Sequence, residues 1–216
     1  METIIPRLFT PPKQGFFLFG PRGTGKSTWL KANIPDAIWI DLLEADEFRS
    51  YSARPERLKE LVLAETGKKI VVIDEIQKVP DLLSVVHSLI EKKLKFRFIL
   101  TGSSPRKLKK TGADLLAGRV IKQAFHPFMA VELGRKFNLT SALKQGLLPL
   151  VFSAAAPEAV LRTYASLYVR EEVQAEGLVR NIGNFSRFLE AVSFSHGSLL
   201  NTSNVARDCE VERKTV

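Results

Sequence analysis

One segment of the sequence has glycines, a lysine and a serine at the spacing of a phosphate-binding loop. It runs G-x-x-x-x-G-K-S and follows a continuous apolar stretch. Glycines let backbone N–H groups turn inward around phosphate oxygens, Lys26 can reach the β- and γ-phosphates, and the Ser27 hydroxyl can bind Mg²⁺. The residues expected at a bound nucleotide are Gly20, Pro21, Arg22, Gly23, Thr24, Gly25, Lys26, Ser27 and Thr28. The alternative is an ordinary glycine-rich turn, but a strand before the loop and a helix after it favour a phosphate site.

A second apolar stretch, residues 70–73, ends in two adjacent acids, Asp74 and Glu75. At the carboxyl end of a buried strand, Asp74 can hold Mg²⁺ through water, and Glu75 can polarise a water that attacks a phosphate. The alternative is a strand that simply ends in polar residues. Because phosphoryl transfer to a bound acceptor must exclude water, the second carboxylate favours hydrolysis over transfer.

Two further positions could contact the γ-phosphate. The stretch 96–101 is followed by small polar residues, among which Ser103 is the first candidate and Thr101 the second. A helix cap at Ser104-Pro105 is the alternative, and both interpretations can hold together. Arg119 follows a glycine and could stabilise transition-state charge, an effect worth about 10³–10⁵ in rate in related systems. Its alternative is an ordinary surface arginine.

These residues need a scaffold of alternating strands and helices. Apolar stretches of strand length occur at 15–19, 37–41, 70–74, 96–101 and 120–124. Helical spacing occurs near 25–32, near 58–65 with Gly67 as a left-handed cap, and after Pro80. The segment 42–54 allows no firm prediction. The alternation predicts an α/β fold with a parallel sheet covered by helices on both sides.

The chain beyond residue 128 is mainly helical, which predicts an ATP-binding domain over 1–150 and a helical region over 151–216. A long helix is expected from Glu158 to about Glu176. The stretch 201–216 resembles a helix-turn-helix, with Thr202 or Ser203 as cap and a second helix beginning near Glu212. Its turn carries Glu210 where glycine is usual. The sequence stops inside that second helix, so we expect a fragment and a truncated winged helix.

Composition narrows the classes of protein. The chain has 216 residues, a formal charge of +9 and one cysteine, Cys209, which excludes an internal disulfide framework. No apolar run reaches the length of a membrane span and no signal peptide is recognisable, so the cytoplasm is the expected compartment. The basic stretch 91–110 can attract a polyanion or simply be a solvated surface. His87 and His126 lack metal-ligand neighbours.

The four motifs together resemble AAA-type (AAA+) P-loop ATPases. More closely, the chain is similar to a prokaryotic family in which the AAA domain precedes a winged-helix-containing domain of unknown function. The segments that carry this resemblance are GPRGTGKST, VVIDEIQKVP, FILTGSSPRKL, DLLAGRV, LYVREEVQAEGLVRNIGNFSRFLEAV and NTSNVARDCEVERKTV. It implies a sheet order of 5-1-4-3-2. It also implies the following roles: Lys26 and Ser27 on ATP–Mg²⁺, Asp74 on Mg²⁺, Glu75 as base, Ser103 as sensor and Arg119 as a finger or phosphate sensor.

The sequence therefore predicts a Mg²⁺-dependent ATP hydrolase whose nucleotide cycle moves the C-terminal helical region. An ATP-dependent DNA-binding switch with little turnover is the alternative. A small-molecule kinase is a third hypothesis, but no Arg-rich lid is recognisable. ATP is the expected ligand, DNA or a protein is the expected partner of the C-terminal region, and a homo-oligomer follows if Arg119 acts in trans.

Overall fold

The structure is a computed structural model that describes residues 5–103, 108, 116, 118–168, 182–195 and 197–213. Its contacts divide the chain into two compact units, Met1–Leu161 and Arg162–Val216, which are considered separately. The domain boundary expected near residue 150 stays a prediction. None of the helices in the described ranges has the length and apolar character required to span a bilayer.

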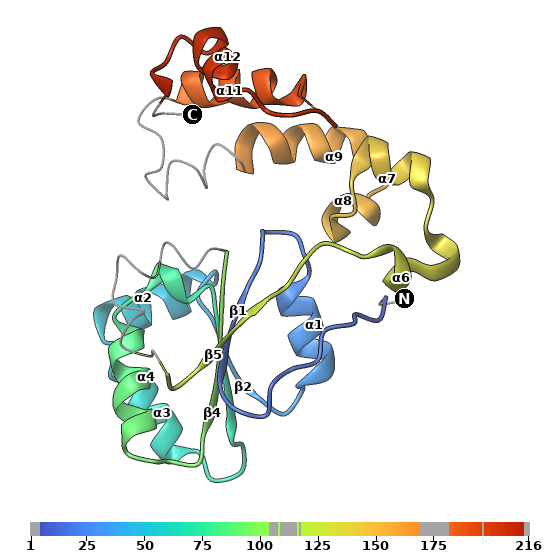
Figure 1. Cartoon of the computed structure of the whole chain (residues 1–216). Helices are drawn as coiled ribbons and strands as arrows, with labels where there is room; N and C mark the ends of the chain where they lie inside the picture. Colours follow the sequence, from blue (N-terminus) through green and yellow to red (C-terminus); the bar gives the residue numbers. More distant parts are fainter. Residues whose placement is uncertain are drawn as a thin grey trace. The chain divides into compact units, whose positions relative to one another are not determined.

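The first unit begins as an alternation of short strands and helices and continues as a series of short helices (Figure 1). Its elements are β1 (Phe16–Phe19), α1 (Lys26–Asn33), β2 (Ile38–Asp41), α2 (Ala45–Ala53), α3 (Arg57–Ala64), β3 (Ile70–Asp74), η1 (Ile76–Lys78), α4 (Leu82–Glu91), β4 (Arg97–Gly102), β5 (Ile121–Ala124), α6 (Ala130–Leu133), η3 (Gly134–Lys136), α7 (Leu139–Gln145), α8 (Pro149–Phe152) and α9 (Pro157–Thr163).

The five strands form one parallel sheet in the order β2-β3-β4-β1-β5, which confirms the expected order 5-1-4-3-2. Phe16 of β1 lies beside Ile99 on one side and Ile121 on the other. Because all strands run the same way, the carboxyl ends of β1, β4 and β3 lie next to one another. This edge therefore collects the glycine loop after β1 and the acids after β3.

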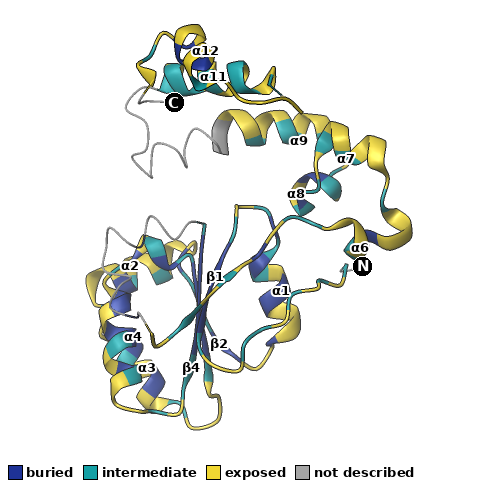
Figure 2. Ribbon diagram, in the orientation of Figure 1, coloured by how far each residue is buried: buried dark blue, intermediate teal, exposed yellow. Residues whose placement is uncertain are grey.

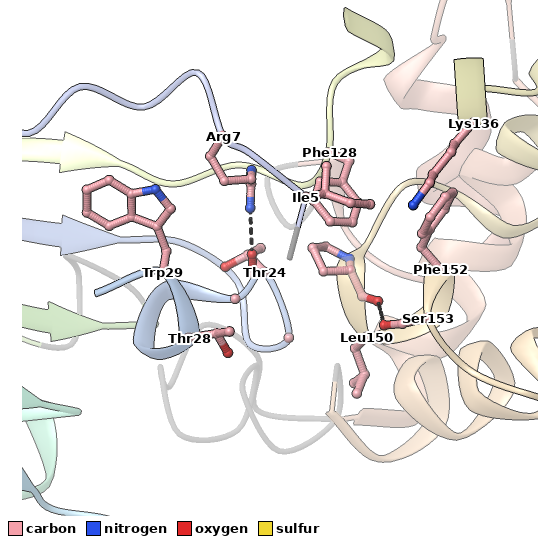
Figure 3. Close-up of a pocket in the computed structure, with 13 residues that line it drawn as sticks. Ile5, Arg7, Thr24, Thr28, Trp29, Phe128, Lys136, Leu150, Phe152 and Ser153 are labelled. Atoms are coloured by element: carbon pink, nitrogen blue, oxygen red, sulfur yellow. Dashed lines mark hydrogen bonds between the residues drawn. The ribbon is translucent and has the colours of Figure 1, made fainter. Parts of the chain in front are cut away.

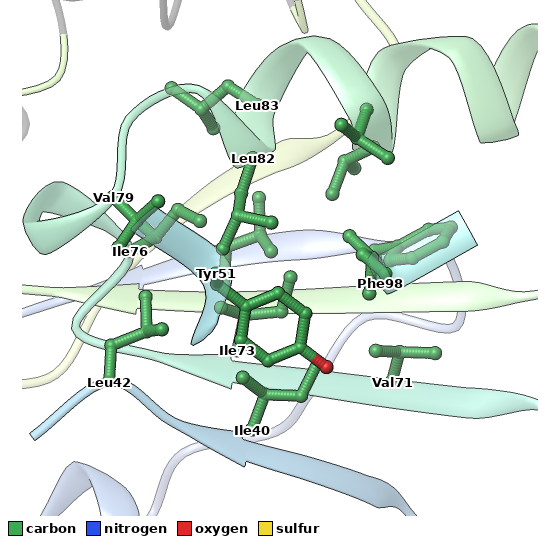
Figure 4. Packing of buried hydrophobic residues seen from close by; sticks show 14 of the residues in the cluster. Ile40, Leu42, Tyr51, Val71, Ile73, Ile76, Val79, Leu82, Leu83 and Phe98 are labelled. Carbon is green, nitrogen blue, oxygen red and sulfur yellow. The ribbon is translucent and has the colours of Figure 1, made fainter. Parts of the chain in front are cut away.

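Helices cover both faces of the sheet, with α2, α3 and α4 on one face and α1 on the other (Figure 1). Alternate residues of each strand feed two separate apolar cores. Phe17, Ile73 and Phe98 pack in the larger core with α2–α4 (Figure 4), and Phe16 and Leu18 pack with α1 in the smaller one. Strands buried on both faces explain the continuous apolar stretches in the sequence, and Figure 2 shows this burial along the sheet.

Two local expectations change. Helix α2 occupies most of the segment 42–54, for which the sequence allowed no firm prediction. The left-handed cap expected at Gly67 was wrong: α3 ends at Ala64, and Glu65 takes an extended conformation. The Glu65 carboxylate accepts hydrogen bonds from the N–H groups of Gly67 and Lys68 at 2.8 and 3.2 Å, so a side chain instead of a glycine turn organises this end.

The boundary between the two units falls inside α9, the described part of the expected long helix. Helix α9 is followed by a π-helical turn, η4 (Tyr164–Tyr168), and the expected continuation to Glu176 lies outside the described residues. Helices α11 (Ile182–Ser193) and α12 (Thr202–Asp208) follow. The expected second helix of the helix-turn-helix falls largely on residues 214–216, outside the described part.

The cap and the turn of α12 are described. The cap is Asn201 and neither Thr202 nor Ser203, because the Asn201 side chain accepts the N–H groups of Ser203 and Asn204 at 3.0 and 3.2 Å. Glu210 has a positive φ of 53°, so a left-handed turn forms there without glycine.

Candidate functional site

The glycine loop keeps its shape because side chains are excluded at specific points. A Cβ on Gly20 would lie 2.1 Å from the carbonyl oxygen of Phe125, which only glycine avoids. Gly23 and Gly25 have positive φ angles of 77° and 85°. Thr24, which is fully buried, donates its hydroxyl to the carbonyl of Pro21 at 2.8 Å. The loop therefore has a defined turn before α1 begins.

Lys26 is the first residue of α1 and is 5% exposed. Its Nζ donates hydrogen bonds to the carbonyl oxygens of Gly20 at 2.7 Å and Pro21 at 3.2 Å. The ammonium thus lies over the loop, where phosphate oxygens can replace carbonyl oxygens as its acceptors. Pro21 and Arg22 are exposed in the loop, as is Thr28 within the first turn of α1.

Five side chains meet where the carboxyl ends of β3 and β4 lie beside α1; we call them the acid cluster, and they are Ser27, Asp74, Glu75, Gln77 and Thr101. The Ser27 hydroxyl donates to Oδ2 of Asp74 at 2.5 Å, and the Thr101 hydroxyl donates to Oδ1. The same Thr101 oxygen accepts the N–H of Glu75 at 3.0 Å. Asp74 is 1% exposed, so these hydroxyls satisfy a carboxylate that has left water.

Glu75 and Gln77 extend the acid cluster. Glu75 has a left-handed backbone with φ of 57°, which costs a non-glycine residue roughly 1–2 kcal/mol. Its carboxylate accepts a hydrogen bond from Nε2 of Gln77. The other amide atom, Oε1 of Gln77, is buried and has no hydrogen-bond partner among the described residues. An unpaired buried acceptor costs about 1–3 kcal/mol, so this amide is held at an energetic cost.

The structure places the two candidates on β4 in different surroundings, and their roles at the γ-phosphate stay predictions. Ser103 directly follows β4, at the edge that carries the loop, and is partly exposed. Thr101, the second choice, is fully buried and joins Asp74 to Glu75. The cap expected at Ser104-Pro105 lies outside the described residues.

Arg119 lies at the opposite edge of the sheet. It precedes β5, whose first residue, Ile121, pairs with Phe16 at the start of β1. The four residues of β1, at about 3.3 Å each, separate this edge from the loop. Nε of Arg119 instead donates to Glu91 at 2.5 Å. An arginine finger acting on the loop of its own chain is contradicted by this position, and a role towards a neighbouring copy stays a prediction.

A second polar network binds the phosphate loop, and we call it the loop clamp. It consists of Arg7, Glu132 and the Leu150 N–H, which bind the carbonyls of Gly23 and Thr24. Arg7 donates to Thr24 O at 2.9 Å and to both oxygens of Glu132 at 3.1 Å. The Leu150 N–H donates to Gly23 O at 3.2 Å. The loop is thereby tied to the N-terminal segment, α6 and α8.

The ion pair of the loop clamp is buried, with the side chains of Arg7 and Glu132 7% and 2% exposed. Burial raises the pKa of Glu132, but hydrogen bonds from the N–H groups of Met129 and Leu8 and from Arg7 outweigh it and lower the pKa below its usual value. The guanidinium also lies 4.2 Å from the centre of the Phe125 ring. Nε donates to Glu132 and another guanidinium nitrogen donates to Thr24 O while the plane stacks on this ring, a combination that arginine provides and lysine does not.

A cavity of about 470 Å³ opens between the loop, the start of α1 and α8 (Figure 3). Gly23, Thr24, Gly25 and Thr28 form its phosphate-loop side. Its remaining lining is mostly apolar and comprises Ile5, Arg7, Trp29, Phe128, Lys136, Pro149, Leu150, Phe152 and Ser153. An apolar cavity of this size with a few polar groups is typical of small-molecule sites.

Sequence reasoning missed Gln77, Arg7, Glu132 and the cavity wall. Gln77 stands two positions after Glu75, so a search for amides near the acid pair could have found it. Arg7 and Glu132 are 125 positions apart, and no periodicity connects them.

Comparison with known proteins identifies the family. The AAA domain family matches residues 13–134, which is more than half of the chain, and the chain belongs to this family. Residues 136–216 match a domain of unknown function (DUF8612). These matches confirm the resemblance to AAA-type P-loop ATPases followed by a domain of unknown function, and membership of the family implies nucleotide binding at the loop.

Individual relatives match less strongly. An uncharacterized protein of Mycobacterium tuberculosis is 26% identical over 203 residues, covering 92% of this chain and 45% of the relative, so the chain spans less than half of that protein. An AAA-ATPase of Arabidopsis thaliana is 44% identical over 66 residues, which is 31% of this chain and 13% of that protein. The structure of the Aeropyrum pernix Orc1 protein in complex with DNA has a TM-score of 0.43 at 15% identity, covering 93% of this chain and 72% of that one.

Proposed function

We propose that the chain binds ATP with Mg²⁺ and hydrolyses its terminal phosphoanhydride bond. The observation that carries the proposal is the contact of 2.5 Å between the Ser27 hydroxyl, at the start of the phosphate-loop helix, and the Asp74 carboxylate at the end of β3. Two motifs that are 47 positions apart thus converge on one point. Convergence at the carboxyl edge of a parallel sheet is where α/β proteins bind ligands.

The residues present fit a magnesium ion. Hydroxyl and carboxylate oxygens are the ligands this hard cation prefers, and Ser27 and Asp74 provide both on one side of the loop. When bound, Mg²⁺ would neutralise charge that develops on the phosphate oxygens. Thr101, whose hydroxyl bonds to Asp74, would keep the carboxylate in place.

Each remaining residue has a role that its position supports. Lys26 would exchange its two carbonyl acceptors for phosphate oxygens, and the left-handed glycines would present backbone N–H groups to the same phosphates. The apolar cavity beside the loop would take the base, with Trp29 and Phe152 among its walls. Glu75 would accept the proton of the attacking water as general base. Ser103 and Arg119 keep the roles of sensor and trans-acting finger as proposals.

The loop clamp supports the idea that nucleotide state is passed to the helical region. The Leu150 N–H binds Gly23 O, so a change in loop conformation would be felt by α8. We infer that the residues that follow α8 respond to the nucleotide cycle.

Steady-state ATP hydrolysis by the parent chain and by Asp74→Asn tests the proposal. Asp74→Asn should lower the rate of Mg²⁺-dependent ATP hydrolysis about 10²-fold or more, because it removes the negative charge of the carboxylate that would hold the metal. Asp46→Asn makes the same chemical change on the exposed surface of α2 and should retain parent activity. Parent and Asp74→Asn turning over at the same rate would refute the proposed site.

A DNA-binding switch is the second candidate. Helix α12 has a side-chain cap at Asn201 and a left-handed turn at Glu210, which are features of a helix followed by a tight turn. This candidate predicts DNA affinity that depends on ATP and falls steeply with salt. Affinity that is indifferent to ATP would exclude the switch.

A further inference from the structure

The side chain of Gln77 belongs to the acid cluster, but the proposed mechanism gives it no role. We propose that Gln77 is a positioning residue that orients the Glu75 carboxylate towards the attacking water. The inference rests on the proposed hydrolase function and deepens it. The amide acts through Glu75 and has no assigned contact with the nucleotide.

The backbone that carries Gln77 is rigid. Gln77 lies in the middle of η1 (Ile76–Lys78), and the N–H groups of Lys78 and Val79 close this turn onto the carbonyls of Glu75 and Ile76 at 2.9 and 3.1 Å. Ile76 is fully buried and Val79 is 3% exposed, so both ends of the turn are anchored in the larger core. The amide therefore starts from a fixed point close to Glu75.

Glu75 is held at both ends. Its N–H is bound by the Thr101 hydroxyl, and its carboxylate accepts from Nε2 of Gln77. A carboxylate has two oxygens that each accept hydrogen bonds, so the bond at Oε2 orients the group without using Oε1. Gln77 would thus orient Glu75 in the way that a general base is oriented by a neighbouring hydrogen-bonding group in many active sites.

The orientation of the Gln77 amide is determined by chemistry. Only Nε2 can donate, so it must face the carboxylate, and Oε1 then points to the other side, where Gly102 leaves room for it. A Cβ on Gly102 would lie 2.9 Å from this oxygen. Oε1 is buried and has no hydrogen-bond partner among the residues that the structure describes.

This burial argues against a purely structural role. An amide oxygen buried without a partner costs free energy, whereas methionine has a similar length and shape and no such cost. A glutamine at this position thus gains nothing in stability from its oxygen. What methionine could not provide is the hydrogen bond to Glu75, and this bond is the reason we assign the residue a role in positioning.

The experiment compares the parent chain with Gln77→Met, Glu75→Gln and the double variant, measuring kcat, ATP affinity and Tm for each. We expect Gln77→Met to lower kcat by about tenfold or more, less than Glu75→Gln, because an oriented general base contributes about 10²–10⁴ in rate. ATP affinity should stay within about twofold, and Tm should be unchanged or higher since an unpaired acceptor is removed.

Two controls distinguish positioning of Glu75 from a structural contribution of the Gln77 side chain. In the double variant, Gln77→Met should cause no further loss, because its effect passes through Glu75. Gln14→Met makes the same change on the exposed surface before β1, at the opposite edge, and should keep parent kcat. Parent activity in Gln77→Met, or a loss of kcat that accompanies a lower Tm and weaker ATP binding, would overturn the inference alone. Absence of turnover in the parent chain would overturn both this inference and the proposed function.

Discussion

The acid cluster and the loop clamp hold the same phosphate loop by different chemistry. The acid cluster consists of hydroxyls, an amide and carboxylates, and its oxygens can exchange their present partners for a metal ion or a water proton. In the loop clamp, backbone carbonyls are bound by a guanidinium and an N–H, and the charge of the guanidinium is compensated by Glu132. The first network can take part in chemistry, and the second fixes geometry.

This difference predicts separable effects of mutation. Changes in the acid cluster should all reduce turnover, with an added loss of stability at buried Thr101, while changes in the loop clamp should mainly reduce stability and nucleotide affinity. A loop-clamp variant that lost turnover while keeping its stability and ATP affinity would show that the two networks are coupled more tightly than their contacts indicate.

Arg7→Met should have the largest effect on stability. It leaves Glu132 buried without its cation, and removal of one partner of a buried ion pair typically costs about 3–5 kcal/mol. Urea unfolding measures the loss. Arg7→Lys keeps the charge but not the planar guanidinium that reaches Glu132 and Thr24 O at once, so it should recover only part of the stability. Unfolding of Arg7→Met at the parent urea midpoint would show that the clamp contributes nothing.

Thr101→Val should have the next largest effect on stability. It is nearly isosteric and removes the hydroxyl that joins Asp74 to the Glu75 N–H. Leaving buried groups without partners should cost about 1–3 kcal/mol and should also reduce kcat. Thr101→Ser keeps the hydroxyl and is the matched control. If the Val and Ser variants hydrolyse ATP equally well, the Thr101 hydroxyl makes no contribution to turnover.

The clamp should also make stability depend on pH. The pKa of Glu132 is lowered from 4.5 in the folded chain, so its contribution is present above that value and is lost as pH falls through the folded pKa. The difference in unfolding free energy between the parent and Glu132→Gln should therefore be full at pH 7 and shrink below about pH 4.5. A difference that is constant down to pH 3 would contradict this assignment.

Arg119→Ala should have the smallest effect on stability. Its partner, Glu91, is half-exposed, and exposed ion pairs contribute about 0–1 kcal/mol. If Arg119 serves a neighbouring copy, specific activity should rise with protein concentration in the parent and not in this variant. Concentration-independent activity of the parent, over a range in which the oligomer assembles, would exclude that role.

The two networks also differ in how far the sequence predicts them. The phosphate loop, Asp74 and Glu75 are visible because glycines and acids directly follow apolar stretches, and the carboxyl ends of parallel strands must meet. The bond between Thr101 and Asp74 was not predicted, because spacing cannot tell which hydroxyl at a strand end points to the acids. For Arg119 the signal was present but not used: it directly precedes the expected strand 120–124, and the residue before a strand of a parallel sheet lies at the amino edge, opposite the phosphate loop.

The loop clamp could not be predicted from the sequence. Arg7 and Glu132 meet only after the sheet has formed and the chain has returned past β5, so their pairing is a product of tertiary structure. Gln77 is an intermediate case: it is local to Glu75, but its role depends on burial against Gly102, the last residue of β4.

The most direct test of the account is ATP hydrolysis and ATP binding by the parent chain and by Glu75→Gln. The amide keeps the shape of the side chain but cannot accept the proton, so both proteins should bind ATP with similar affinity and only the parent should turn it over. Equal turnover by the two proteins would contradict the role of Glu75. Binding by both with hydrolysis by neither would contradict the hydrolase function and leave a nucleotide-binding switch.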